Sequence, residues 1–374
     1  MDTPVVLSHA SAYLVLHARN RQAVVHNALT SPVDPYRISE SGTHARNIAA
    51  RIRVFLRECG VSLENETEID IAVPTSLDRT SSAFFKSHVV GTSCNSSELV
   101  HIAPGLFAVG GALNFIQAAT WMEPLELIEY GYELCGRYEL DLTEARGDYR
   151  DRRPLTSRQR IHAALANHPN MPGAKRARHA LAFVRDGSRS PMETALALAI
   201  VLPKAKGGLG YRHIVLNHRI LIPQELKATI RSDYLEVDIF APHRNVGVEY
   251  DGDAHSELKR RTHDSDRLAI LGMLGVSMRT ITASHFMHQL DFHRAMNSVA
   301  ALLHLKLPTA RDCQLAQNDL RITLVRGGGN STTIERPPTP DRRASTSSHH
   351  DRHGLTCNHL FLTLVMLTKI TTIF

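Results

Sequence analysis

The sequence predicts a protein of the α/β (α+β) class, in which a separate α+β N-terminal domain precedes a second domain with a mixed sheet flanked by helices. The chain has 374 residues, of which 43% are hydrophobic, and this is enough to bury two modest cores. Short apolar runs that end at proline or glycine alternate with longer segments of helical periodicity. Both observations favour strands and helices mixed along the chain.

Residues 1–145 are expected to form the first domain. The runs 69–76 (IDIAVPTS) and 99–111 (LVHIAPGLFAVGG) are typical of strands that end at proline or glycine. The run 112–138 has a helical pattern. A sheet with at least one helix is therefore expected before the middle of the chain.

Residues 146–189 are strongly basic and contain two expected helices, 157–168 and 173–187. The segment holds eleven Arg or Lys residues against three Asp residues, a net charge of +8, whereas the whole chain carries +6. Clustered cations suit a polyphosphate partner because each neutralised phosphate releases counterions. The segment is therefore interpreted either as a DNA contact, with Arg176 and Arg178 among the binding residues, or as a solvated helical linker.

Residues 190–307 are expected to form the second domain. Ser190 is placed to cap a helix that contains Pro191 in its first turn and Glu193 at its third position, as in a capping box. The expected elements that follow are paired strands, a helix over 256–274, a strand over 276–282 and a helix over 284–305.

The remaining sequence features concern the tail and the cell compartment. Residues 308–374 are rich in Gly, Pro, Ser and Thr and are expected to be disordered. The final apolar run, 360–374, is interrupted by Lys369 and is short for a membrane span, so no membrane partner is expected. No Cys-x-x-Cys pair occurs, and the first residues lack the pattern of a secretory signal, which together favour a cytoplasmic protein.

Residues 234–241 and 245–251 alternate in polarity around a turn and are expected to form an antiparallel hairpin. A turn centred between residues 243 and 244 places Asp238 opposite Glu249 and Glu236 opposite Asp251. Period two then puts these four carboxylates on one face of the hairpin. The apolar residues expected on the other face are Val237, Ile239, Val246, Val248 and Tyr250.

A face of opposed carboxylates indicates a cation site, because like charges directly across a strand pair cost about 0.2–1 kcal/mol each. Asp238, Glu249 and Asp251 are the candidate metal ligands, and hard oxygen donors suit Mg2+ or Mn2+. The alternative is an exposed hairpin face whose acids are simply hydrated. Gly252 permits a sharp exit from the strand, which would aim His255 back at the site as a general acid or base. An ordinary surface histidine is the other interpretation.

The helix that follows begins with three basic residues. Lys259, Arg260 and Arg261 are candidates for contact with DNA phosphates, although a solvated first turn explains them nearly as well. Asp264 and Arg267 are three residues apart and are therefore expected on one face of that helix.

The order of these residues resembles the PD-(D/E)XK nuclease superfamily, and more narrowly the small endonuclease-domain proteins related to very short patch repair endonucleases. The resemblance covers roughly residues 188–305. It rests on the following residues: Glu193 on a helix, Asp238 on a strand, Glu249-Tyr250-Asp251-Gly252 on the next strand, His255 after a turn, then Asp264, Arg267, Leu271 and Gly275.

The resemblance implies a restriction-endonuclease-like core, with Asp238 as central metal ligand and Glu249 as the second carboxylate. It also implies that Glu193 contributes through hydrated metal and that His255 takes part in proton transfer. Asp251 occupies the position where the superfamily has a lysine. The function of that lysine is therefore either absent or supplied by His255 or Lys259.

The expected function is metal-dependent hydrolysis of DNA phosphodiester bonds, with Mg2+ or Mn2+ as cofactor and DNA as partner. A homodimer is conceivable, because a nuclease with one site usually needs two copies to cut both strands. The alternative is a non-catalytic DNA-binding or antitoxin-like regulator on a degenerate nuclease fold, since the first half resembles N-terminal parts of proteins allied to abortive-infection antitoxins. A sugar or nucleotide hydrolase with paired carboxylates is a third interpretation.

Overall fold

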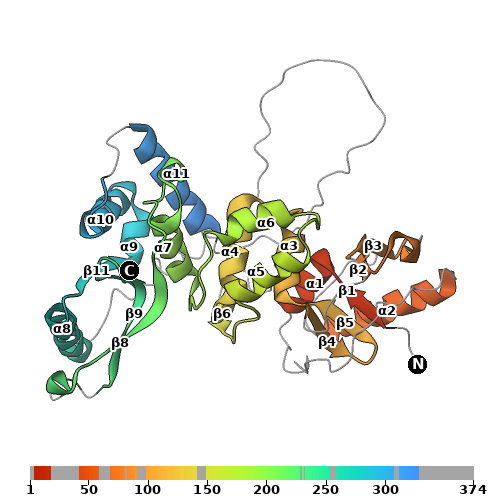
Figure 1. Cartoon of the computed structure of the whole chain (residues 1–374), viewed down its shortest axis with the longest axis horizontal. Coiled ribbons are helices and arrows are strands. Elements are labelled where there is room, and N and C mark those ends of the chain that lie inside the picture. The colour runs from red at the N-terminus through yellow and green to blue at the C-terminus, as the bar shows by residue number, and fades with distance from the viewer. Residues whose placement is uncertain are drawn as a thin grey trace, which may run out of the picture.

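The chain has a mixed α/β architecture in which sheets are flanked by helices (Figure 1). The five-stranded and four-stranded sheets lie at opposite ends of the molecule, and a group of helices lies between them. The computed structural model describes the following residues: 4–17, 42–58, 68–80, 82–90, 98–140, 149–227, 230, 232–252, 258–306 and 311–327.

The N-terminal sheet has the strand order β3-β2-β1-β5-β4. Its central strand β1 runs parallel to β5 and antiparallel to β2, and these three strands are buried along their whole length. The expected strands over 69–76 and 99–111 are confirmed. The elements are β1 Val5–Leu7, α1 His9–Leu16, α2 Gly42–Glu58, β2 Ile69–Val73, β3 Phe85–Val89, β4 Leu99–Ala103 and β5 Leu106–Val109.

The helix expected over 112–138 is in fact two helices, α3 Gly111–Ala118 and α4 Pro124–Cys135. A proline is favoured in the first turn of a helix, and here it starts the second one. The backbone N–H of Glu123 donates to the side chain of Glu126, which completes a capping box at this start. The break between the two helices therefore has a local cause in the sequence.

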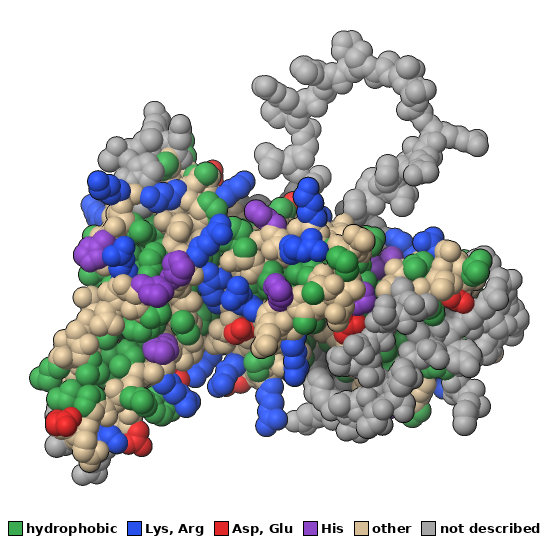
Figure 2. Space-filling model, in the orientation of Figure 1, with side chains coloured by type: hydrophobic (Ala, Val, Ile, Leu, Met, Phe, Trp, Pro, Cys, Tyr) green, Lys and Arg blue, Asp and Glu red, His purple; other side chains and the backbone are tan. Residues whose placement is uncertain are grey.

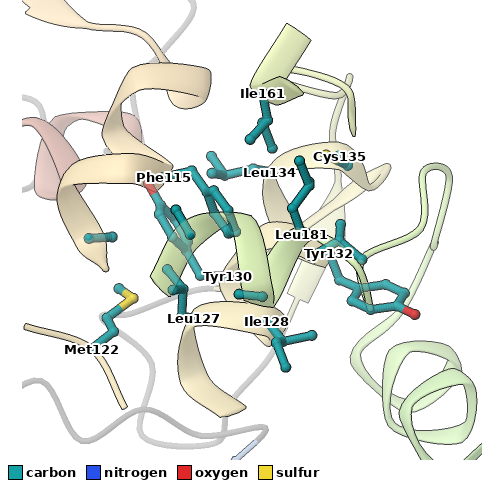
Figure 3. Packing of buried hydrophobic residues seen from close by; sticks show 14 of the residues in the cluster. Phe115, Met122, Leu127, Ile128, Tyr130, Tyr132, Leu134, Cys135, Ile161 and Leu181 are labelled. Carbon is teal, nitrogen blue, oxygen red and sulfur yellow. The ribbon is translucent and has the colours of Figure 1, made fainter. Parts of the chain in front are cut away.

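The basic segment is part of the hydrophobic core and does more than link two domains. Its helices α5 Arg158–Asn167 and α6 Ala174–Leu181 pack against α3 and α4 (Figure 3). Buried Ile161 and Leu181 lie among Phe115, Leu127 and other apolar side chains of this helical layer. This role was not predicted, because the many charges of the segment conceal its regularly spaced apolar positions. The short hairpin β6 Tyr138–Leu140 and β7 Tyr149–Asp151 adjoins the layer.

The second sheet has the order β11-β10-β9-β8. Strands β8, β9 and β10 are successively antiparallel, and β11 runs parallel to β10 after a crossover through α8. Helix α7 packs against β9 and β10, and every residue from Thr194 to Val201 is buried. The elements are α7 Pro191–Val201, β8 Val215–Leu221, β9 Tyr234–Ala241, β10 Val246–Asp251, α8 Leu258–Met273, β11 Ser277–Thr282, α9 Ala283–Met287 and α10 Gln289–Leu302.

The register of the β9–β10 hairpin is the predicted one, with Val246 opposite Ala241 and Val248 opposite Ile239. The predicted separation of faces is only partly right. Ile239 and Val248 belong to the large core that includes α7, whereas Val237 packs in a separate cluster with Ile270 and Leu271 of α8. The change of face occurs at Asp238. The ladder with β8 keeps its register on both sides of this residue, but the pair Asn217–Asp238 is missing, and Asn217 has a left-handed φ of 47°.

The expectation of a disordered tail is wrong for its first part. Residues 311–327 form helix α11 (Arg311–Gly327), which packs against α7 and α10 and buries Leu320 and Leu324. Residues 328–374, including the apolar run at the end, lie outside the described residues. Among the helices that the structure describes, none is long and apolar enough to cross a membrane.

Candidate active site

Glu193 is held in the first turn of α7 by three hydrogen bonds. Its backbone N–H donates to Ser190 Oγ at 3.1 Å, which confirms the expected cap. Its Oε2 accepts from the backbone N–H of Arg189 at 3.0 Å, one residue earlier than in the expected capping box. The same Oε2 accepts from Asn217 Nδ2 of β8 at 2.9 Å. The carboxylate is therefore fixed between the helix start and the sheet.

Asp238 lies where β9 and β10 separate beyond the last paired residues. Its Oδ2 accepts a hydrogen bond of 2.9 Å from the backbone N–H of Tyr250. The pKa of Asp238 is raised from its usual 3.8 to about 6, first by burial and then by the carboxylates of Glu193 and Glu249. The Tyr250 N–H and the Arg267 guanidinium act in the opposite direction. The negative charges of two other carboxylates therefore act on Asp238.

Glu249 is paired with Arg267 of α8 through two hydrogen bonds. Arg267 Nη1 donates to Oε2 at 2.8 Å, and Nη2 donates to Oε1 and to the backbone oxygen of Glu236. The two side chains are only 19% and 16% exposed, so solvent screens this pair weakly. A guanidinium on Glu249 partly offsets the negative charge of the three carboxylates.

Glu236 is held by two arginines on the Asp238 side of the hairpin. Arg189 Nη1 donates to Oε1, and Arg219 Nε lies 3.3 Å from Oε2. Burial alone would raise the pKa of Glu236, but these two arginines hold it below its usual range. The Glu236 bond raises the pKa of Arg189, and the charges of Glu193 and Asp238 add to this effect. Glu236 is therefore compensated by protein cations.

Tyr149 of β7 also reaches this region. Burial raises the pKa of the Tyr149 phenol, and the nearby carboxylate of Glu193 raises it further. Tyr149 in turn raises the pKa of Tyr250, which burial brings to about 12. The hairpin β6–β7 thus adds an exposed phenol beside the carboxylates. No pattern in the sequence predicted that Tyr149 lies there.

The structure describes only some of the other predicted site residues. Asp251 lies exposed at the end of β10, and its charge acts on Tyr250. His255 lies outside the described residues, and Lys259, Arg260 and Arg261 lie in α8 with side chains that are not described. Among the described side chains, no group of three His, Cys, Asp or Glu is arranged to hold a metal ion.

Lys and Arg side chains gather on the middle of one face of the molecule (Figure 2). Arg176 and Arg178 on α6 are exposed, and their guanidinium groups donate to backbone oxygens of Met122 and Pro169. Arg185 is buried instead and binds three backbone oxygens, so it belongs to the fold rather than to a binding surface. Further exposed cations of the segment are Arg153, Arg158, Arg160 and Lys175.

The partners of the carboxylates were not predicted from the sequence. Arg267 was placed on one face of its helix by spacing alone, Arg189 was only one cation of the basic segment, and Asn217 carried no signal. The fold identifies these contacts. It places Asp238 near the charges of Glu193 and Glu249, with Arg267 on Glu249 and Arg189 on Glu236.

Comparison with known proteins identifies no relative of this chain. No protein-family model matches it, and neither a curated protein nor a solved structure does so.

Proposed function

We propose that this protein is a metal-dependent endonuclease that hydrolyses DNA phosphodiester bonds at the opening between β9 and β10. The observation that carries the proposal is the placement of the partly buried Asp238 carboxylate, which accepts from the Tyr250 N–H and on which the charges of Glu193 and Glu249 act. Desolvated carboxyl groups beside like charges are typical of functional sites. The order α7-β8-β9-β10-α8-β11, with β11 parallel to β10, supports the resemblance to the PD-(D/E)XK core.

The donors for a hard divalent cation are proposed from the resemblance, because the described side chains form no ready-made group of three metal ligands. Asp238 and Glu249, with Glu193 through hydrated metal, would hold Mg2+ or Mn2+ through carboxylate oxygens. Arg267 would then have to release Glu249. Such an ion activates water and neutralises charge on a phosphate. The Tyr250 N–H fixes the orientation of the Asp238 carboxylate.

The arginines beside the carboxylates provide a complementary role. Arg189 and Arg219 flank Glu236 on the same strand as Asp238, and guanidinium groups match phosphate geometry. They would hold a DNA phosphate next to the carboxylates. By resemblance, His255 remains the proposed group for proton transfer, and Lys259 to Arg261 remain proposed DNA contacts.

A plasmid assay tests the proposal. The purified full-length protein is expected to nick or cut supercoiled DNA with Mg2+ or Mn2+, and a chelator should stop the reaction. Asp238→Ala is expected to abolish cleavage. Asp233→Ala is the matched control, because that carboxylate is exposed and pairs with Lys227 outside the site. Cleavage that survives in Asp238→Ala would refute the assignment.

A non-catalytic DNA-binding regulator is the second candidate function. Two observations favour it. Arg267 binds both carboxylate oxygens of Glu249, and position 251 has no lysine. This function predicts DNA binding that needs no metal and weakens with salt. Replacing Arg176 and Arg178 by serine should then lower the slope of log affinity against log salt by about one for each residue.

A further inference from the structure

A second cluster of titratable side chains lies in the N-terminal half, at the junction of β1 and α1. His88 Nε2 of β3 lies 2.8 Å from Asp70 Oδ1 of β2. The ring of His9 stacks on that of His88, with centroids 3.6 Å apart and planes inclined by 18°. Lys86 is the register partner of Asp70, and its charge acts on His9. We call His9, Asp70, Lys86 and His88 the histidine cluster.

The fold holds His9 in an unusual backbone conformation. Its φ is 45°, in the left-handed region that is costly for residues other than glycine. Two buried side chains of α3 fix it: the His9 N–H donates to Gln117 Oε1 at 2.8 Å, and Asn114 Nδ2 donates to the His9 oxygen at 3.0 Å. Tyr130 Oη donates to Asn114 Oδ1 at 2.5 Å. Burying polar side chains costs free energy. The use of two buried amides to hold His9 therefore indicates that its position is important.

Buried polar groups lie beside the cluster. Gln117, which binds the His9 N–H through Oε1, is 1% exposed, and within the described part of the chain its Nε2 has no hydrogen-bond partner. The buried Ser8 Oγ lies 3.2 Å from His9 Nδ1 and does not cap α1. The start of a helix carries a partial positive charge, which adds to that of Lys86.

We propose that the histidine cluster binds the phosphate group of a small phosphate-bearing ligand. Lys86 supplies a fixed positive charge. In its doubly protonated form, His88 donates one ring N–H to Asp70 and the other to the anion. His9 contributes an uncharged ring that stacks on the ring of His88. This site is independent of the proposed nuclease site.

The neutral state of His9 fits this role. The pKa of His9 is lowered to about 3, first by burial and then by the neighbouring His88 and Lys86, against the opposing effect of Asp70. His9, Lys86 and His88 are each half-buried. His9 therefore contributes an uncharged imidazole to the stack.

The chain contains a built-in reporter for this site. Trp121 is the single tryptophan of the sequence, and its ring centroid lies 5.9 Å from that of His9. Full-length protein would be titrated at constant pH and ionic strength with inorganic phosphate, ribose 5-phosphate and a short oligothymidylate, while Trp121 fluorescence is recorded. A saturable change is expected. The probe that binds most tightly identifies free phosphate, a small phosphate ester or a nucleic acid backbone as the source of the group.

Two substitutions and two controls decide the outcome. Lys86→Met and His88→Gln are each expected to raise the dissociation constant roughly tenfold, as loss of a charged hydrogen bond would. Lys206→Met and Asp233→Ala change exposed residues outside both proposed sites and should bind like the wild type. Lys86 is half-buried at the surface, so its variant keeps the test valid even where His88→Gln does not fold. The proposal is overturned when no probe gives a saturable change, or when Lys86→Met binds as tightly as the wild type.

Discussion

The pairing of Arg267 with Glu249 leads to a prediction that separates the two candidate functions. Arg267→Met keeps the aliphatic stem and removes the guanidinium from Glu249. Breaking a fully buried pair costs about 3–5 kcal/mol, whereas exposed pairs contribute about 0–1 kcal/mol. These side chains are 19% and 16% exposed, so a loss of about 2 kcal/mol is expected. At about 2–4 °C per kcal/mol, the Tm should fall by roughly 4–8 °C.

A divalent ion should reverse this loss if the carboxylates bind metal. An ion at a hundred times its dissociation constant stabilises the folded state by about 2.7 kcal/mol. In the wild type the ion competes with Arg267 for Glu249, and in the variant it does not. The assay is thermal unfolding with and without Mn2+, in which the Tm of Arg267→Met should rise by several degrees more than that of the wild type. Arg267→Met combined with Asp238→Asn is the control and should lose the rise.

Equal Tm shifts of wild type and Arg267→Met with Mn2+ would refute this reasoning. The cation of Arg267 would then not compete with a metal ion, and the non-catalytic function would be favoured.

Two further predictions concern stability. Because the folded-state pKa of Asp238 is raised from 3.8 to about 6, the fold loses stability as pH rises from about 3.8 to about 6, and the loss is complete above that range. Asp238→Asn should therefore be about 2 kcal/mol more stable than the wild type at pH 8, and urea unfolding should find this gain lost near pH 4. Gly131→Ala would place a Cβ 2.6 Å from Val184 Cγ2 and 2.8 Å from Phe115 Cε2, and should cost about 1–3 kcal/mol in the same measurement. Gly272→Ala meets no atom within 4 Å and is the control; an equal loss in both variants would contradict the packing of the basic segment on α4.

The local signals in the sequence were reliable where a short pattern decides the structure. The hairpin register followed from alternation and from the position of its turn, and the start of α7 followed from Ser190 and Pro191. The fold class and the strands over 69–76 and 99–111 rest on the same kind of signal. Each depends on residues within a few positions of one another.

Charge patterns were less reliable because the sequence does not say which face a charge occupies. Arg185 counted toward the basic segment, yet its guanidinium is buried on backbone oxygens. Arg176 and Arg178 are exposed as a binding surface requires. The apolar residues between these cations make the segment part of the core. Helix α11 was likewise not predicted, because its segment is rich in polar residues.

The sequence by itself determined the mixed fold class, the strands over 69–76 and 99–111, the start of α7 and the hairpin register, and it singled out Glu193, Asp238 and Glu249 as candidate carboxylates. Only the tertiary structure decided that Arg267 holds Glu249, that Asn217 holds Glu193 and that His9 stacks on His88. Alternation and capping act between near neighbours, so they can be read along the chain. Ion pairs and ring stacks join residues far apart in sequence, and their partners exist only once the sheets and helices have packed.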